Sequence, residues 1–341
     1  ANNATGFLIT TLDEPVVKYP DIVKVNEWDL PAIANIDKTA TASQYDMQIV
    51  FQCENNPTVN RAATRLAGKH AKNSIIIQLD VDNNHRAFII DDNTHAEWRE
   101  ISHNELVTKL KIQPENGKIR WQVVGHGRSE GGNDKHPTLA GQRPEQLTAR
   151  LNQFSDYLQT EHQINISPQQ VSLVGCAMSS SDRYTSFAHK FMSHLNENGI
   201  RTNVSASTKA IEVDPQGHKH DVDTPDIDSY NNKYLSSIKG TEKLYWNRWG
   251  EITTERKKDI NGRLNNIDSL LDKLITRQLS VNQLNKKQQR KLAEIFPQLT
   301  DKKLNKGELL LTLHDSWRMQ ALKYDLLFLQ KISDRPDFDT E

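Results

Sequence analysis

The chain has 341 residues, 36% of them hydrophobic, and its formal net charge at pH 7 is −1. This length suits about two domains, no apolar run approaches the ~18 residues of a membrane-spanning helix, and near-neutrality gives no global basis for nucleic-acid binding. Two cysteines, Cys53 and Cys176, are too few for a disulfide framework, which favours a reducing compartment such as the cytosol. The N-terminus has neither an initiator Met nor a signal-peptide pattern, so we expect a segment of a longer protein.

Hydrophobic periodicity predicts an irregular start and then a long α/β region. Residues 1–44 contain three prolines and no sustained period. From residue 45 onward, apolar runs alternate with amphipathic stretches. The expected strands are residues 48–52, 74–79, 86–90, 118–125, 170–175 and 202–206, and the expected helices are residues 57–71, 144–158 and 187–199. Helices of this length between strands favour right-handed crossovers, which predicts an α/β fold with a mainly parallel central sheet flanked by helices.

The pattern changes after residue 206. Residues 207–255 predict short strands and turns, including a strand at 243–253, whereas residues 256–341 have almost no β signal and place leucines along helical faces. We therefore expect three parts: residues 1–44, residues 45–255, and a helical domain at residues 256–341.

Two short motifs carry the chemistry. Val-Gly-His-Gly at residues 124–127 and Val-Gly-Cys-Ala at residues 174–177 each follow an apolar strand, which places His126 and Cys176 beyond the carboxyl ends of strands. Open α/β sheets have their sites at that edge. A thiol needs a base to become a thiolate at neutral pH, and an imidazole within hydrogen-bond distance supplies one. The glycines allow close approach of backbone, and a tight turn at Cys176 can direct N–H groups at an oxyanion.

The same residues also have simpler interpretations. A single cysteine at a strand end is more often structural than catalytic, and an isolated Gly-His-Gly is a weak signal. A metal site is not expected, because two distant cysteines and scattered histidines match no ligand spacing. Spacing alone leaves the Cys–His pair as one hypothesis among these.

Resemblance over a long stretch favours the catalytic interpretation. Residues 45 to about 254 resemble the autoprocessing cysteine protease domain of multifunctional autoprocessing repeats-in-toxin (MARTX) toxins and, more distantly, that of the large clostridial glucosylating toxins. The matching stretches, in order, are residues 48–50, 66–70, 117–128, 172–176, 204–205 and 217–220. The resemblance implies a caspase-like cysteine protease fold, with residues from about 207 to 255 forming a β-flap.

The resemblance also implies a function. His126 and Cys176 fall on the catalytic positions of the family, which cleaves its own parent toxin after leucine once inside a host cell. The family is activated by inositol hexakisphosphate, so the expected setting is a secreted bacterial toxin that is active in the host cytosol. Leu8 and Leu12 are candidate cleavage positions, and Ala1 is alternatively the residue left by an earlier cut upstream.

Asn56 departs from the family pattern, which usually has an Asp at this position to orient the histidine. An Asn can accept from an imidazole N–H, as in Cys-His-Asn sites, although it stabilises an imidazolium less than a carboxylate does. Two roles remain open for Asn56: orienting His126, or capping the helix that begins at Pro57. Both can hold together.

A hexakisphosphate needs several cationic side chains that converge from different elements. The positions carried over from the family are Lys69, Arg120 and the pair His218–Lys219, with Lys118 and Lys233 as weaker candidates. His218 stands where the family usually has Arg, and a neutral imidazole attracts phosphate less than a guanidinium does. A solvated surface charge is the simpler interpretation of any single Lys.

Three questions stay open. Residues 256–341 most simply form a helical bundle, and docking onto a host protein or a membrane surface is the alternative, with Lys286, Lys287, Arg290 and Lys291 as a basic run. A host protein rather than the polyanion is an alternative activator, for a protease that acts on itself or on host proteins. An inactive inositol-phosphate-binding module is the third alternative, although retention of His126 and Cys176 argues against it.

Overall fold

The computed structural model describes residues 23–36, 45–90, 95–112, 117–130, 136–179, 186–222, 240–246, 250–257, 286–287 and 289–290. The chain divides into two compact units, Ala1–Glu242 and Lys243–Glu341. The two cysteines and both candidate motifs lie in the first unit.

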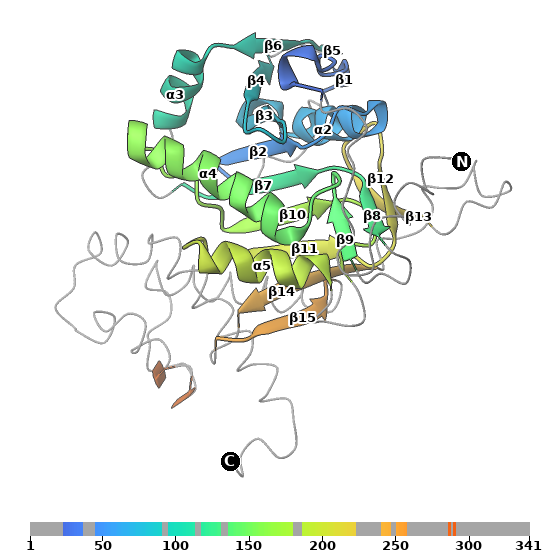
Figure 1. The fold of residues 1–341 in the computed structure, drawn as a ribbon, viewed down its shortest axis with the longest axis vertical. Helices are drawn as coiled ribbons and strands as arrows, with labels where there is room; N and C mark the ends of the chain where they lie inside the picture. The colour runs from blue at the N-terminus through green and yellow to red at the C-terminus, as the bar shows by residue number, and fades with distance from the viewer. Residues whose placement is uncertain are drawn as a thin grey trace, which may run out of the picture. The chain divides into compact units, whose positions relative to one another are not determined.

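A mixed sheet with a parallel centre organises the first unit (Figure 1). Its strand order is β11 (Asn203–Ser207), β10 (Gln170–Val174), β7 (Ile119–Val124), β2 (Met47–Gln52), β3 (Ser74–Leu79), β4 (His85–Ile90) and β6 (Trp98–Ile101). The strands from β11 to β3 pair in parallel, and β4 and β6 add antiparallel pairs at one side. The predicted α/β fold with a mainly parallel sheet is confirmed.

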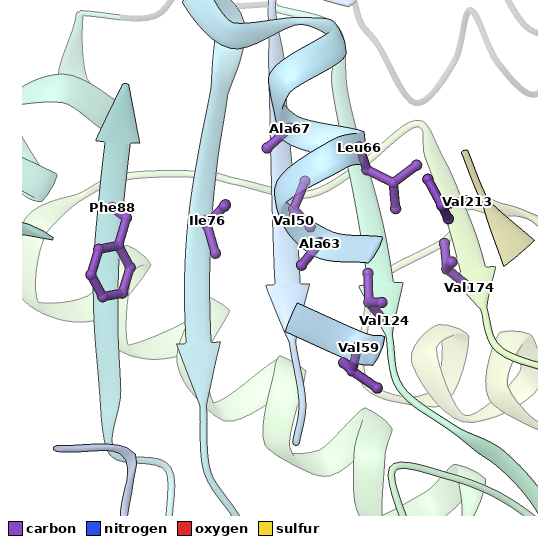
Figure 2. Packing of buried hydrophobic residues seen from close by; sticks show 10 residues of the cluster. All are labelled: Val50, Val59, Ala63, Leu66, Ala67, Ile76, Phe88, Val124, Val174 and Val213. Atoms are coloured by element: carbon purple, nitrogen blue, oxygen red, sulfur yellow. The ribbon is translucent and has the colours of Figure 1, made fainter. Parts of the chain in front are cut away.

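Helix α2 (Pro57–Lys69) covers one face of this sheet (Figure 2). Asn56 caps its N-terminus, Pro57 occupies the first turn, and the apolar residues recur at helical spacing. The buried cluster beneath α2 consists of Val50, Val59, Ala63, Leu66, Ala67, Ile76, Phe88, Val124, Val174 and Val213. One helix thus contacts residues from the strands that carry both candidate motifs.

Helices α4 (Pro144–His162) and α5 (Phe187–Glu197) lie next to each other against the other face. Successive strand residues point to opposite faces, so Phe51 faces away from the α2 cluster that holds Val50. The Phe51 ring makes edge contacts with Trp121 at 5.3 Å and with Phe154 of α4 at 5.8 Å between centroids. The predicted helices at residues 144–158 and 187–199 are therefore present, with α4 one turn longer.

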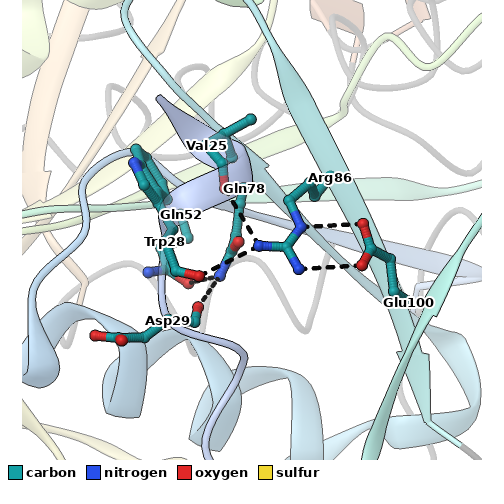
Figure 3. A network of polar contacts seen from close by, with 7 residues as sticks. All are labelled: Val25, Trp28, Asp29, Gln52, Gln78, Arg86 and Glu100. Carbon is teal, nitrogen blue, oxygen red and sulfur yellow. Dashed lines mark hydrogen bonds and ion pairs between the residues drawn. The ribbon is translucent and has the colours of Figure 1, made fainter. Parts of the chain in front are cut away.

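Residues 23–36, which we call the strap, pack onto this unit although they belong to the segment predicted to be irregular. The strap contains a short 3-10 turn, Val25–Glu27, and strand β1 (Ala34–Asn35), which pairs with β5 (His95–Ala96). Arg86 donates to the carbonyl oxygens of Val25 and Trp28, 3.2 Å each, and forms a bidentate ion pair with Glu100 (Figure 3).

Several elements were not predicted. Helix α3 (His103–Lys111) and the hairpin β8 (Gly127–Glu130)–β9 (His136–Leu139) have no strong periodic signal. By contrast, β12 (Ala210–Val213) pairs with β13 (Lys219–Val222), which agrees with the short strands and turns expected from residue 207 onward. The single strand expected at residues 243–253 is instead two adjoining strands, β14 (Thr241–Trp246) and β15 (Ile252–Arg256), and Gly250 before β15 has a left-handed φ of 75°.

Little of the predicted helical domain falls within the described residues. Arg256 ends strand β15, residues 257, 286–287 and 289–290 are helical, and the other residues of 256–341 lie outside the described ranges. Within those ranges, no helix combines the length and apolar character that spanning a bilayer requires. The boundaries 44/45 and 255/256 and the flap role of residues 207–255 stay predictions.

Candidate active site

The loops that carry His126 and Cys176 follow two neighbouring strands. Strands β7 and β10 are parallel, and Val124 lies opposite Val174. The pairing continues past the strand ends, because the N–H of Gly125 donates to the carbonyl oxygen of Val174 at 3.2 Å. The two reactive side chains therefore leave the same edge of the sheet from adjacent positions.

Glycines let the two loops touch through their backbones. A methyl group on Gly127 would lie 2.0 Å from the carbonyl oxygen of Cys176 and 2.7 Å from its nitrogen. A methyl group on Gly175 would lie 3.0 Å from the carbonyl oxygen of Gly125. The contacts at Gly127 are with backbone and exclude a side chain, so the close approach of the two loops requires a glycine at this position.

The backbone of His126 is held from both sides. Its N–H donates to the Glu54 carboxylate at 2.5 Å, and its carbonyl oxygen accepts from the N–H of Ala140 at 2.9 Å. The other carboxylate oxygen of Glu54 pairs with Arg128 at 3.3 Å. Sequence reasoning missed Glu54, because its place just beyond β2 points to His126 only once β2 is known to pair with β7.

The turn after Cys176 is strained. Ala177 has φ 54°, a left-handed conformation that costs a non-glycine residue about 1–2 kcal/mol. Its N–H donates to the carbonyl oxygen of Lys209 at 3.0 Å. Cys176 itself is a free, partly exposed thiol. Backbone strain of this kind clusters at functional sites.

Cys53, the other cysteine, is unsuited to nucleophilic chemistry. It is buried, with 3% of its surface exposed, and burial raises the pKa of its thiol to about 12. Its sulfur lies 3.7 Å from the carbonyl oxygen of Phe51, as a weak donor. Of the two thiols, Cys176 is the one in a position to react.

Asn56 occupies the helix cap. Its Oδ1 accepts from the N–H groups of Thr58 at 2.9 Å and of Val59 at 3.4 Å. The capping role is thus present. The role in orienting His126 stays a prediction.

Lys69 and Arg120 bring their positive charges together away from these loops. Lys69 ends α2 and Arg120 is the second residue of β7. Burial lowers the pKa of Lys69, and the charge of Arg120 lowers it further against the opposing effect of Asp214. Burial, then Lys69 and Arg120, lower the pKa of neighbouring His70 to about 4. Positive charge is therefore crowded here, with the Arg120 guanidinium 5.6 Å from the ring centroid of Tyr45.

The β12–β13 hairpin brings its turn to the same end of α2. A methyl group on Gly217 would lie 2.5 Å from the carbonyl oxygen of Arg65 and 2.9 Å from Cβ of Lys69. Asp214 accepts from the N–H of His218 at 2.9 Å and lies 2.7 Å from Nε2 of His220. These contacts place the segment with His218 and Lys219 beside Lys69.

One further candidate falls within the described residues. Lys118 is exposed just before β7, and its N–H donates to Asp46 at 2.7 Å. Lys233 lies outside the described residues, as do Leu8 and Leu12. The described part of the chain has no group of three or more His, Cys, Asp or Glu side chains arranged to hold a metal ion.

A free thiol and a histidine on touching loops at the carboxyl edge of an α/β sheet are features of a cysteine peptidase. The model of the peptidase C80 family matches residues 43–222, and the chain belongs to this family.

Two relatives bear the name multifunctional-autoprocessing repeats-in-toxin. The protein of Vibrio cholerae serotype O1 is 32% identical over 241 residues, and that of Vibrio vulnificus is 32% identical over 243 residues. Each match covers 70% of this chain but only 5% and 4% of the relative, respectively. The resemblance to MARTX protease domains is thereby confirmed.

Proposed function

We propose that this chain is an autoprocessing cysteine endopeptidase with Cys176 as nucleophile and His126 as general base. His126 takes the thiol proton, the thiolate attacks the scissile carbonyl carbon, and the protonated imidazole gives its proton to the leaving amine. Water then hydrolyses the thioester, releasing the new carboxylate and the free thiol. The observation that carries the proposal is the contact between the Gly127 and Cys176 backbones, which sets both loops side by side.

The proposed substrate is the parent polypeptide, cut after a leucine. The names of the two relatives, which describe those proteins as autoprocessing toxins, support this choice. Leu8 and Leu12 remain the candidate positions. The proposed setting is a secreted bacterial toxin whose protease acts in the host cytosol.

The proposed activator is inositol hexakisphosphate, bound by Lys69, Arg120 and the hairpin residues His218 and Lys219. The lowered pKa of Lys69 supports this, because burial and a neighbouring cation leave its charge poorly compensated. A bound polyanion would reduce the repulsion between Lys69 and Arg120. It would also favour the position of the hairpin that lets His218 and Lys219 contact the polyanion.

The test is autocleavage of a purified chain, extended upstream, with and without inositol hexakisphosphate. We expect cleavage that needs both the polyanion and Cys176, so Cys176→Ala is inactive and the matched variant Cys53→Ala cleaves normally. Cleavage only after addition of eukaryotic cytosol would indicate that the activator is a host factor and not the polyanion. Cleavage by Cys176→Ala would overturn the assignment of the nucleophile, and no cleavage under any condition would favour a binding module.

A further inference from the structure

Glu54 is the acidic side chain that contacts the histidine loop. Its carboxylate accepts the backbone N–H of His126 through one oxygen and pairs with Arg128 through the other, at 2.5 and 3.3 Å. The side chain is 19% exposed, so both bonds form with partial exclusion of water. Glu54 therefore bridges the first residues after β2 and the loop that follows β7.

The backbone of Glu54 is fixed in turn by two buried glutamines. Gln52 donates from Nε2 to the carbonyl oxygen of Glu54 at 3.1 Å, and its Oε1 accepts from Gln78 at 3.3 Å. Gln78 also donates to the carbonyl oxygen of Asp29 in the strap at 2.9 Å (Figure 3). Both glutamines are fully buried and lie opposite each other on β2 and β3. This line of bonds holds Glu54 against a rigid part of the sheet.

We propose that Glu54 is the positioning residue of His126, and that its acceptor oxygen sets where the imidazole stands relative to Cys176. This proposal rests on the proposed function. The bond is to the backbone of His126, so Glu54 acts through the loop and not on the reacting atoms. Arg128 takes up the second oxygen and keeps the carboxylate in the orientation that meets the His126 N–H.

The position matters because proton transfer needs a base within hydrogen-bond reach of the thiol. The Ala140 bond fixes the carbonyl side of His126, and Glu54 is the bond on the amide side. Without it, the amide side of His126 keeps, among the described residues, only the neighbouring bond from the Gly125 N–H to Val174, so the histidine can shift. A displacement of about 1 Å can lower a rate roughly a hundredfold.

The test compares Glu54→Met, which keeps the length but removes the acceptor, with Glu54→Gln, which keeps an acceptor oxygen. Both are made in the full chain and assayed on a leucine-containing peptide. For Glu54→Met we expect kcat to fall roughly tenfold to a hundredfold with KM changed by less than about threefold. For Glu54→Gln we expect kcat within about fivefold of the starting protein.

Matched controls come from the exposed pair Arg99–Glu105, 3.0 Å apart on β6 and α3. Glu105→Met and Glu105→Gln should leave kcat unchanged. Thermal unfolding of every variant shows that it is folded. If Glu54→Met does not fold, Arg128→Gln gives the alternative measurement, with an expected loss of a few fold in kcat alone.

Unchanged kcat in folded Glu54→Met, equal losses in the Met and Gln variants, or a loss confined to KM would each overturn the proposal. If the Arg128→Gln variant is measured instead, an unchanged kcat would also overturn the proposal. The rate at which iodoacetamide alkylates Cys176 at pH 7 tests the positioning role of Glu54 independently of the proposed peptidase activity. Slower alkylation in Glu54→Met, rescued in Glu54→Gln, supports the positioning role even if the starting protein cleaves no peptide, whereas equal alkylation rates in all variants overturn it.

Discussion

Cys53 and Cys176 both follow central strands, yet their surroundings give them different reactivity. Burial raises the pKa of Cys53 to about 12, so it stays a thiol at neutral pH, whereas Cys176 is partly exposed. We predict that the folded chain consumes one equivalent of iodoacetamide at pH 7.5 and the unfolded chain two. Folded Cys53→Ala should consume one equivalent, like the folded unaltered chain, and Cys176→Ala should label only after unfolding. Labelling of Cys53 in the folded protein, read by peptide mass spectrometry, would contradict this.

His70 gives a second residue-scale prediction, on pH dependence. Its pKa falls from the ordinary 6.5 to about 4 in the folded chain, through burial and the charges of Lys69 and Arg120. The unfolded chain therefore binds a proton first as pH falls, so stability from this group is present above pH 6.5 and is lost toward pH 4.

Urea unfolding tests this pH dependence. The unfolding free energy of the unaltered chain should fall more between pH 7 and pH 4.5 than that of His70→Gln. His194→Gln, which changes a histidine on α5, serves as the control and should follow the unaltered chain. The same slope in all three would show that His70 titrates normally.

At the scale of elements, the contact between the β7 and β10 loops depends on Gly127. In Gly127→Ala the new methyl group would lie 2.0 Å from the Cys176 carbonyl oxygen, so the loops must separate. We expect the protein to fold and to lose on the order of a hundredfold in kcat, since about 1 Å of misplacement has that effect. Gly199→Ala is the control: it has open space and φ 87°, so it should lose about 1 kcal/mol of stability and no activity.

The β12–β13 hairpin has a similar dependence on Gly217. Its φ is 83°, and a methyl group there would meet the Arg65 carbonyl oxygen and the Lys69 side chain. Gly217→Ala should push the turn away from α2. We predict that more inositol hexakisphosphate is then needed for half-maximal cleavage, while the rate at saturation is unchanged. If the concentration for half-maximal cleavage is unchanged, this turn takes no part in activation.

The elements that sequence could predict are those with local signals. Helix α2 has its Asn56 cap and Pro57, and α4 begins at Pro144 and keeps one apolar face, so both were found. Helix α3 buries only Leu106 and Leu110, which is too few apolar positions for a period to appear. The hairpin β8–β9 is short, and its pairing across the intervening residues has no local signal.

The residues of the candidate site could likewise be predicted only where they have a local sequence signal. His126 and Cys176 stand in glycine motifs directly after strands, so their shared edge followed from the sheet topology. Glu54 has no motif, and its contact with His126 depends on β2 and β7 being neighbours, which sequence does not reveal. The strap was missed because its bonds come from distant side chains, such as Arg86 and Asn60, rather than from a hydrophobic period.

At the scale of the first unit, strand β7 links the two proposed sites. Arg120 lies near its beginning and His126 just past its end, so at about 3.3 Å per residue roughly 20 Å separates their backbones. A phosphate bound at Arg120 therefore cannot touch the reacting thiol. The proposed activation would therefore have to pass through an element with two positions, and the hairpin that contacts α2 is the described element best placed for it.

With this separation, the activation that we propose is a linkage between two binding events. A polyanion that binds only the folded chain stabilises it by RT ln(1 + [L]/Kd), or about 2.7 kcal/mol at a hundredfold excess over Kd. We predict that inositol hexakisphosphate raises the unfolding temperature of Cys176→Ala and that the shift shrinks with added salt, because salt screens the attraction between the free polyanion and the basic site. Lys69→Ala and Arg120→Gln should lose the shift, whereas Lys111→Ala, at the exposed end of α3, should keep it.

Linkage also runs in the reverse direction. If the polyanion improves binding of a leucine peptide by some factor, the peptide must improve binding of the polyanion by the same factor. Calorimetry on Cys176→Ala, with and without a saturating uncleaved peptide, measures that factor directly. A polyanion that shifts the unfolding temperature but leaves peptide affinity unchanged would be a stabilising ligand and not an activator that acts on substrate binding. If the unfolding temperature does not shift at all, the activator is instead a partner that does not bind to the basic residues of α2 and β7.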